Sequence, residues 1–272
     1  MNQIVKFKQN AVVLDTETTN MLPELCEVVE VAGSTWQDGN WYADSALLGA
    51  HNGIPPEASA KNNISNRMIA GLPTFDQNLD TVKRILNWDT KQFFVAHNSS
   101  YDQSALATAF GRCDLAVDIT QCLDKTRWIC TYRLSKHIID NDFNDMQYNL
   151  SYLRYKLDLP VHDDVTVHRA ADDTLVCAAL LDYLVDKAIT KGLVNPNDNI
   201  GVQLVNLSWN FIPIKTWPFG KYKGQLLKDV PTDYYLWEFE NLTQFKEGQS
   251  SYDYDLAESV RAVLEARLTE NA

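Results

Sequence analysis

The stretch "AVVLDTETTN", residues 11–20, begins as an apolar strand and ends in two acids. The four apolar residues at 11–14 are typical of a strand entering a core, and Asp15 and Glu17 follow with one residue between them. Successive side chains of a strand alternate between its faces, so these two carboxylates project to the same side. Like charges that close repel, and one of them resists ionisation. A solvated strand end is the alternative explanation for such a pair.

The composition indicates a folded protein with a sizeable core. The chain has 272 residues, 45% of them hydrophobic, which suits one large domain or a medium domain with a small appendage. Five cysteines without a CxxC pair favour reduced thiols over a disulfide framework or a zinc site. We see no secretory signal and no apolar run of about 18 residues, so we expect a cytoplasmic protein with no membrane partner.

The net charge of −12 argues against broad electrostatic binding of nucleic acid, because phosphate contacts need lysine and arginine. It leaves room for a small basic groove. It also allows a site at which bound metal ions supply the positive charge.

Hydrophobic periodicity predicts strands early in the chain and alternating strands and helices after them. The expected strands are residues 4–17, 25–37, 40–51 and 91–98, the expected helices are 73–88, 99–112, 149–160 and 172–192, and 126–139 is a strand-to-helix transition or a helix. This order predicts an α/β (α+β) domain, a mixed sheet flanked by helices, over residues 8–192.

The composition changes after residue 192. The stretch "GLVNPNDNIG" at 192–201, with three asparagines, two glycines and a proline, predicts a linker at 193–202, and we expect a small C-terminal module over 203–272. Four lysines of the module lie among aromatic residues: Lys215, Lys221, Lys223 and Lys228 near Trp217, Phe219 and Tyr222. Such a pattern can hold single-stranded nucleic acid by charge and stacking. The alternative is a β-hairpin-plus-helix unit with its aromatics in its own core, which the acids of "VPTDYYLWEFENL" at 230–242 favour.

Two further acids and a histidine stand at element boundaries. Asp102 falls in the first turn of the helix after strand 91–98, and Asp173 in the first turn of the long helix, five residues after His168. Each acid alone could serve to stabilise a helix start, and a lone histidine there is commonly a surface or capping residue. Five residues along one helix would leave His168 and Asp173 about 140° apart, so they converge only if His168 lies in the loop. Asp172 is equally acidic but one position off.

Four carboxylates and a histidine together suit phosphodiester hydrolysis. Two divalent ions about 4 Å apart can clamp the attacking and leaving oxygens between such carboxylates. Mg²⁺ and Mn²⁺ prefer these oxygen ligands. A loop histidine with a near-neutral pKa can remove the proton of the attacking water.

Three motifs resemble those of the DEDD exonuclease superfamily. They are "DTETT" at 15–19, "VAHNSSYD" at 95–102 and "HRAADD" at 168–173, the last with the His-x-Ala-x-x-Asp spacing of the histidine branch. Residues 128–138 and 148–160 are similar to exodeoxyribonuclease X and to proofreading subunits. Residues 218–238 resemble a small module found in some exodeoxyribonuclease X-like proteins.

The resemblance implies an RNase H-like fold and 3′→5′ release of nucleoside 5′-monophosphates. It implies two Mg²⁺ ions, replaceable by Mn²⁺, on Asp15, Glu17, Asp102 and Asp173, with His168 as general base. Thr18 and Thr19 would lie against the terminal nucleotide, Met21 or Leu22 beside its base, and Asn98 would order the second motif. The family usually has glycine at position 20. Asparagine tolerates left-handed backbone, so we expect the turn at Asn20 to be kept.

The substrate is less narrowly defined. We expect nucleic acid as the partner, with DNA preferred, as single strands or 3′ ends. The same chemistry on RNA is the alternative, because discrimination rests on contacts to the 2′-OH. A non-catalytic nucleic-acid-binding protein on a nuclease fold is a third hypothesis, and the complete carboxylate set counts against it.

Overall fold

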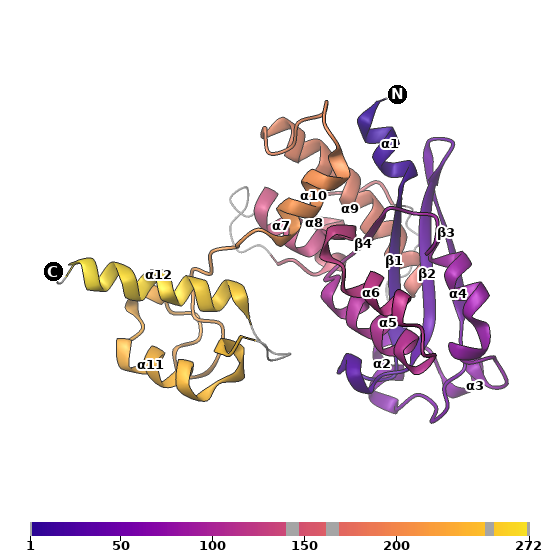
Figure 1. The fold of residues 1–272 in the computed structure, drawn as a ribbon, viewed down its shortest axis with the longest axis horizontal. Helices are drawn as coiled ribbons and strands as arrows, with labels where there is room; N and C mark the ends of the chain where they lie inside the picture. Colours follow the sequence, from indigo (N-terminus) through magenta and orange to yellow (C-terminus); the bar gives the residue numbers. More distant parts are fainter. Residues whose placement is uncertain (1, 140–146, 162–168, 248–252, 271–272) are drawn as a thin grey trace. The chain divides into compact units, whose positions relative to one another are not determined.

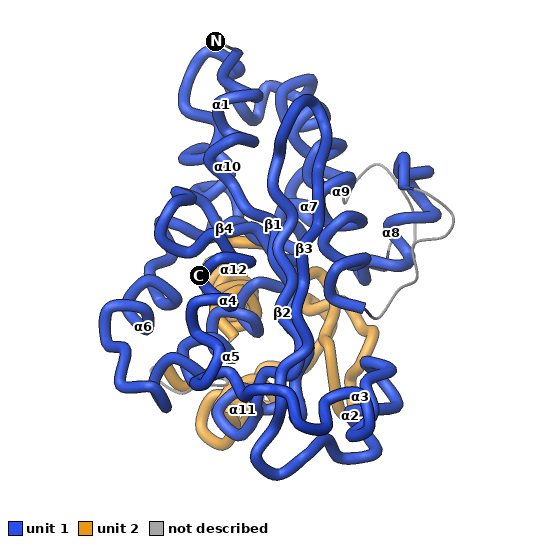
Figure 2. The backbone as a smooth tube through the Cα atoms, turned by 90° about the vertical axis from the view of Figure 1, so that its right-hand side faces the viewer, with its two compact units in different colours: residues 1–209 blue, residues 210–272 orange. Residues whose placement is uncertain are grey.

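The structure, a computed structural model, describes residues 2–139, 147–161, 169–247 and 253–270. The chain forms two compact units, residues 1–209 and 210–272, which are coloured separately in Figure 2. None of the helices described is long and apolar enough to span a membrane.

The first unit is built on a five-stranded mixed sheet (Figure 1). Its strands, in the order β3-β2-β1-β4-β5 across the sheet, are β3 (Asn40–Leu47), β2 (Val28–Gln37), β1 (Ala11–Thr18), β4 (Phe93–Ala96) and β5 (Trp128–Cys130). The first three strands pair antiparallel, whereas β4 is parallel to β1 and β5 is parallel to β4. This confirms the predicted RNase H-like mixed sheet flanked by helices.

The helices of the first unit cover both faces of the sheet. They are α1 (Gln3–Gln9), α2 (Pro56–Asn62), α3 (Asn66–Ile69), α4 (Leu79–Ile85), α5 (Ser100–Arg112), α6 (Ala116–Leu123), α7 (Thr131–Ile139), α8 (Leu150–Lys156), α9 (Ala170–Thr190) and α10 (Ile200–Trp209). The long helix α9 packs against β1, β2 and β3. Helix α5 packs against β1 and β2 and α4 against β2 and β3, with α6 alongside α5.

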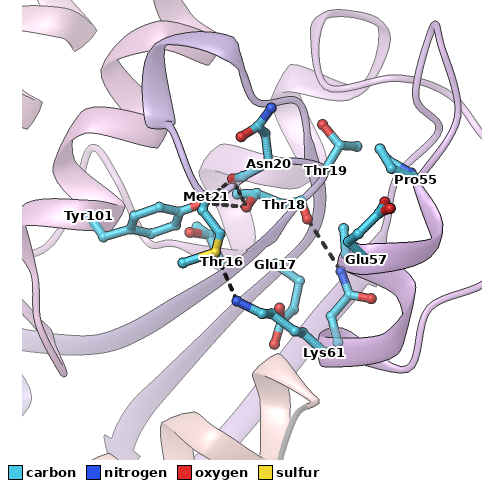
Figure 3. A pocket seen from close by; sticks show the side chains of 12 residues that line it. Thr16, Glu17, Thr18, Thr19, Asn20, Met21, Pro55, Glu57, Lys61 and Tyr101 are labelled. Atoms are coloured by element: carbon cyan, nitrogen blue, oxygen red, sulfur yellow. Dashed lines mark hydrogen bonds between the residues drawn. The ribbon is translucent and has the colours of Figure 1, made fainter.

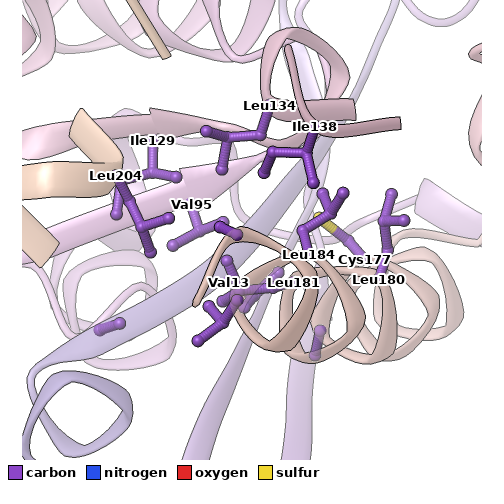
Figure 4. Close-up of a cluster of buried hydrophobic side chains, with 14 of the residues drawn as sticks. Val13, Val95, Ile129, Leu134, Ile138, Cys177, Leu180, Leu181, Leu184 and Leu204 are labelled. Atoms are coloured by element: carbon purple, nitrogen blue, oxygen red, sulfur yellow. The ribbon is translucent and has the colours of Figure 1, made fainter. Parts of the chain in front are cut away.

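Strand β1 is buried on both faces because its side chains alternate between two cores. Ala11 and Val13 join α9, α7 and α10 in one core (Figure 4). Val12 and Leu14 face the core built on α4 and α5. The odd-numbered side chains of β1 therefore point toward the α9 face of the sheet, and the even-numbered ones toward the α5 face.

The beginning of the chain differs from the predicted strand over 4–17. Residues Gln3–Gln9 form α1, and β1 starts only at Ala11. The Asn2 side chain caps the helix by accepting a hydrogen bond from the Ile4 backbone, and Phe7 is buried. A stretch this short, with apolar residues at 4, 5 and 7, fits both the helical repeat and the alternation of a strand. The pattern therefore could not exclude a helix.

The division between the units falls later than the expected start of the module at 203. Helix α10 packs against β5 and α7, so residues 200–209 belong to the first unit. The expected linker at 193–202 leads into this helix, and the second unit begins at residue 210.

The second unit has its own aromatic core. It contains α11 (Thr232–Asn241) and α12 (Tyr254–Glu270), and an isolated antiparallel bridge joins Thr216 to Leu226. Trp217 is completely buried, and Tyr235 and Phe245 pack against it. Gly220 and Gly224 have φ values of 60° and 84° in the intervening turn, where a side chain would strain the backbone. Trp217, Phe219 and Tyr222 thus pack in the core of this unit, as the packing alternative expects, although the bridge between Thr216 and Leu226 is isolated and not part of a β-hairpin.

Candidate active site

The end of β1 and the start of α9 bring three carboxylates together. Carboxylate oxygens of Asp15, Glu17 and Asp173 all lie within 4.8 Å of one another, and all three residues are partly buried. Strand alternation puts Asp15 and Glu17 on the face that α9 covers, and Asp173 lies in the first turn of α9. Among the residues that the structure describes, this is the one cluster of acids, histidines or cysteines close enough to hold a metal ion.

The cluster holds its protons unusually tightly. Burial raises the pKa of Asp15 well above its ordinary range, and the neighbouring carboxylates raise it further. Burial, with repulsion from Asp173 and Glu30, raises the pKa of Glu17 to about 8. A divalent cation would remove this repulsion, and three carboxylates at this spacing form the oxygen ligand set that Mg²⁺ and Mn²⁺ prefer. The residues present therefore fit a divalent metal.

Asp102 reaches the site from the opposite face of the sheet. It lies in the first turn of α5, is 4% exposed, and accepts hydrogen bonds from the Thr16 backbone at 3.1 Å and the Thr16 hydroxyl at 2.8 Å. Burial raises the pKa of Asp102, although both bonds from Thr16 oppose this. Asp102 is outside the three-carboxylate cluster, yet after burial its charge is the largest contributor to the raised pKa of Asp15.

A buried acid on β2 anchors the start of α9. Glu30 is fully buried opposite Glu17 and accepts hydrogen bonds from the Arg169 guanidinium at 3.0 Å and the Ala170 backbone at 3.3 Å. It thereby caps a helix whose own N-cap side chain makes no capping bond. One turn further along, the hydroxyls of Ser34 and Thr174 meet at 2.7 Å. These contacts hold Asp173 against β1.

The sequence reasoning missed Glu30 and Arg169. A signal was present, because Glu30 interrupts the apolar run "VVEVA" at 28–32 of a strand that had to be buried. A charge in such a position needs a partner. The predicted general base, His168, lies outside the described residues, and Arg169 is its neighbour in the chain.

A cavity of about 530 Å³ opens beside the carboxylates (Figure 3). Its walls are the end of β1, the loop after it, helix α2 and Tyr101 of α5. The lining residues include Glu17, Thr18, Thr19, Asn20, Met21, Glu57, Lys61, Asn62 and Tyr101. Three of the predicted substrate residues, Thr18, Thr19 and Met21, are therefore at this cavity, whereas Leu22 is exposed and is not among its lining residues.

The loop after β1 is fixed by side-chain hydrogen bonds. The Tyr101 hydroxyl donates to the Asn20 carbonyl at 2.6 Å and is also bonded to the Thr18 hydroxyl. The Thr19 hydroxyl accepts from the Glu27 backbone at 2.9 Å. Tyr101 was not anticipated, because nothing local in the sequence links it to a loop 81 residues away.

The turn at Asn20 is stabilised by a side-chain hydrogen bond and not by the left-handed backbone that we expected. Asn20 is not among the residues with left-handed backbone, and its side-chain oxygen accepts from the Leu22 backbone at 3.0 Å. Asn98, by contrast, has a φ of 67°, and its carbonyl accepts from the Tyr101 backbone as α5 begins. Asn98 therefore shapes the turn that presents Asp102.

Residues 12–181 match the protein-family model described as "Exonuclease". The chain belongs to this exonuclease family. Membership confirms the predicted resemblance to the DEDD 3′→5′ exonucleases and the prediction of an exonuclease enzyme. The second unit of the exonuclease matches, over residues 211–249, a family described as "Putative quorum-sensing-regulated virulence factor".

Individual relatives agree with this membership. The exonuclease is 26% identical over 235 residues to exodeoxyribonuclease 10 of Escherichia coli K12, an alignment that covers 85% of the chain and 90% of the relative. It is 27% identical over 172 residues to the epsilon subunit of DNA polymerase III of Treponema pallidum, covering 63% of the chain and 74% of the relative.

Solved structures support the fold. Exonuclease X in complex with 5′ overhanging duplex DNA matches with a TM-score of 0.50 and 23% identity, over 73% of the chain and 99% of that protein. Escherichia coli exonuclease I in complex with a dT13 oligonucleotide matches with a TM-score of 0.55 and 12% identity, over 67% of the chain and 42% of that protein.

Proposed function

We propose that the protein is a metal-dependent exonuclease that removes nucleoside 5′-monophosphates from the 3′ ends of DNA, with single strands preferred. The observation that carries the proposal is the three-carboxylate cluster, one member of which, Glu17, lines a cavity of about 530 Å³ together with Thr18, Thr19 and Met21. A cavity of this size suits the last nucleotides at the 3′ end of a strand. The family membership and the DNA in the names of the relatives support DNA as substrate.

The residues divide the work by their position. Asp15, Glu17 and Asp173 would hold one Mg²⁺ ion, and Asp15 with Asp102 would hold a second. Bound there, the two ions would supply charge stabilisation at the attacking and leaving oxygens of the phosphodiester. Thr16 orients Asp102, and Glu30 and Arg169 hold the start of α9. The cavity would position the 3′ end of the strand. His168, next to Arg169 in the chain, would take the proton of the attacking water.

The test is a panel of end-labelled oligonucleotides with Mg²⁺. A 3′-labelled single strand should release its label as a mononucleotide at once, whereas a 5′-labelled strand should shorten as a ladder. Asp15→Asn should be close to inactive, because a ligand shared by both ions is weakened. Asp172→Asn is the matched control. Asp172 is next to Asp173 in the chain but lies outside the carboxylate cluster, so this variant should retain activity. If a His168→Ala protein digests the 3′-labelled strand at the wild-type rate, the proposed role of His168 is excluded.

RNA is the second candidate substrate, because the carboxylate cluster recognises a phosphodiester that DNA and RNA share. Side-by-side digestion of matched DNA and RNA oligomers separates the two. We also propose a cytoplasmic location, which the five free cysteines, four of them buried, support because reduced thiols persist in that compartment.

A further inference from the structure

Helix α2 presents a lysine to the cavity, and the end of this helix is hydrogen-bonded to β1. Asn62, the last residue of α2, is 2% exposed, and its side chain donates to the Thr18 carbonyl at the end of β1 at 3.3 Å. The same side chain accepts from the Ile64 backbone at 3.0 Å. Because the end of α2 is tied to β1 in this way, the backbone of Lys61 is held beside β1, and its side chain lines the same cavity as Glu17 (Figure 3).

Lys61 reaches across the cavity rather than along its own helix. Glu57 precedes it by four residues on α2, a spacing that commonly forms a surface ion pair. Instead, the Lys61 ammonium lies 2.8 Å from the sulfur of Met21, on the loop after β1 (Figure 3). No carboxylate of the described residues lies within ion-pair distance of Lys61. A thioether is a weak acceptor, so most of the hydrogen-bonding capacity and all of the charge of Lys61 remain available.

The cavity otherwise presents negative charge and neutral groups. Lys61 is the one cation among the described residues that line it, and Glu17 and Glu57 are the acids. The metal ions held by the cluster would neutralise the scissile phosphate. The next phosphate of the same strand carries its own charge, and on a chain of net charge −12 it needs a local cation to bind.

We propose that Lys61 binds the phosphate adjacent to the scissile one, and that its contact with Met21 is exchanged for that phosphate when the strand enters. This inference rests on the proposed exonuclease function. It assigns to Lys61 substrate binding rather than chemistry. The loss of Lys61 therefore weakens affinity equally for strands of any sequence and lowers the salt dependence of binding.

The experiment compares Lys61→Gln and Lys61→Arg with the wild-type protein. KM and kcat are measured on a 3′-labelled single strand with Mg²⁺ between 50 and 200 mM salt, about the range over which phosphate contacts are resolved. For Lys61→Gln we expect KM to rise about tenfold with kcat within about twofold, and the slope of log KM against log salt to fall by about 0.7, the value for one phosphate contact on a single strand. Lys61→Arg should restore most of the affinity.

Lys6→Gln is the matched control, because Lys6 is an exposed lysine of α1 and its loss changes the net charge equally. It should leave KM and the salt slope unchanged. A Lys61→Gln protein with wild-type KM and salt slope would overturn the inference. So would a loss confined to one terminal base, which would mean that Lys61 reads the base edge. Absence of cleavage by the wild-type protein would instead count against the proposed function. In that case, fluorescence anisotropy of a labelled strand in the presence of Ca²⁺ measures the affinity of the wild type and of the Lys61 and Lys6 variants without cleavage.

Discussion

Replacing Glu17 by glutamine should stabilise the metal-free protein while abolishing its activity. The Glu17 carboxylate is partly buried among Asp15, Asp173 and Glu30, and its pKa is raised from 4.5 to about 8. A pKa that is higher in the folded than in the unfolded state gives stability that is fully present below pH 4.5 and is lost as the pH rises through about 8. Glutamine carries no charge and removes this loss.

The magnitude follows from the size of the shift. At roughly 1.36 kcal/mol per pKa unit the full shift corresponds to about 5 kcal/mol. The carboxylate is partly exposed, and solvent screening reduces the effect to about 2 kcal/mol. For a unit of this size that is roughly 4–8 °C in Tm.

The assay is calorimetric unfolding from pH 5 to pH 9 in EDTA, following the transition of the first unit. Glu57→Gln is the matched control, since it makes the same substitution on α2 outside the carboxylate cluster, and it should unfold as the wild type does. Mg²⁺ should raise the Tm of the wild type more than that of Glu17→Gln. If Glu17→Gln is no more stable than the wild type at pH 8 in EDTA, then the carboxylates do not repel as the structure indicates.

Three other substitutions test the surroundings of the site and the second unit. Glu30→Gln should raise the Mg²⁺ concentration for half-maximal activity roughly 10–100-fold, as expected for a residue that positions metal ligands, whereas Gln37→Ala at the exposed end of the same strand should not. Thr16→Val removes one donor to Asp102, so urea unfolding should show a loss of about 1 kcal/mol together with slower turnover. Trp217→Ala should destabilise the second unit by roughly 3–5 kcal/mol and leave hydrolysis of a dinucleotide unchanged, measured by calorimetry and mononucleotide release. If Glu30→Gln needs no more Mg²⁺ than the wild type, Glu30 does not position the metal ligands. Unchanged unfolding of Thr16→Val would contradict the role of Thr16 in holding Asp102. Loss of dinucleotide hydrolysis in Trp217→Ala would contradict a purely structural role of Trp217 in the second unit.

The features of the site that follow from local geometry were predictable from the sequence. Strand alternation alone placed Asp15 and Glu17 on one face, and the family motif added Asp173, which the structure brings to them. Asp102 was also predicted, but its attachment to Thr16 was not, because that contact spans 86 residues. The ion pair of Glu30 and Arg169 spans 139 residues and joins a strand to a helix start. Such contacts depend on how the layers pack, which periodicity does not encode.

The boundaries were predicted less well than the elements. An asparagine- and glycine-rich stretch suggested a linker at 193–202, but α10 follows it and packs on the first unit, because Leu204 and Val205 have an apolar surface to cover there. The aromatic residues after 210 could be read either as a binding surface or as a core. The structure decides for the core at Trp217, because only the packed unit shows which rings are buried.

The acids at the end of β1 can lie close together because the strand before them cannot move away. Val12, Val13 and Leu14 are at most 1% exposed and are divided between two cores on opposite faces of the sheet. Burial of each such side chain contributes roughly 1.5–3 kcal/mol, which together exceeds the cost of repulsion at Glu17. The strand therefore holds its register, and the carboxylates can lower their repulsion by taking up protons or by binding cations. The proposed affinity of these acids for metal and the cost that they impose on the metal-free fold thus have one physical origin.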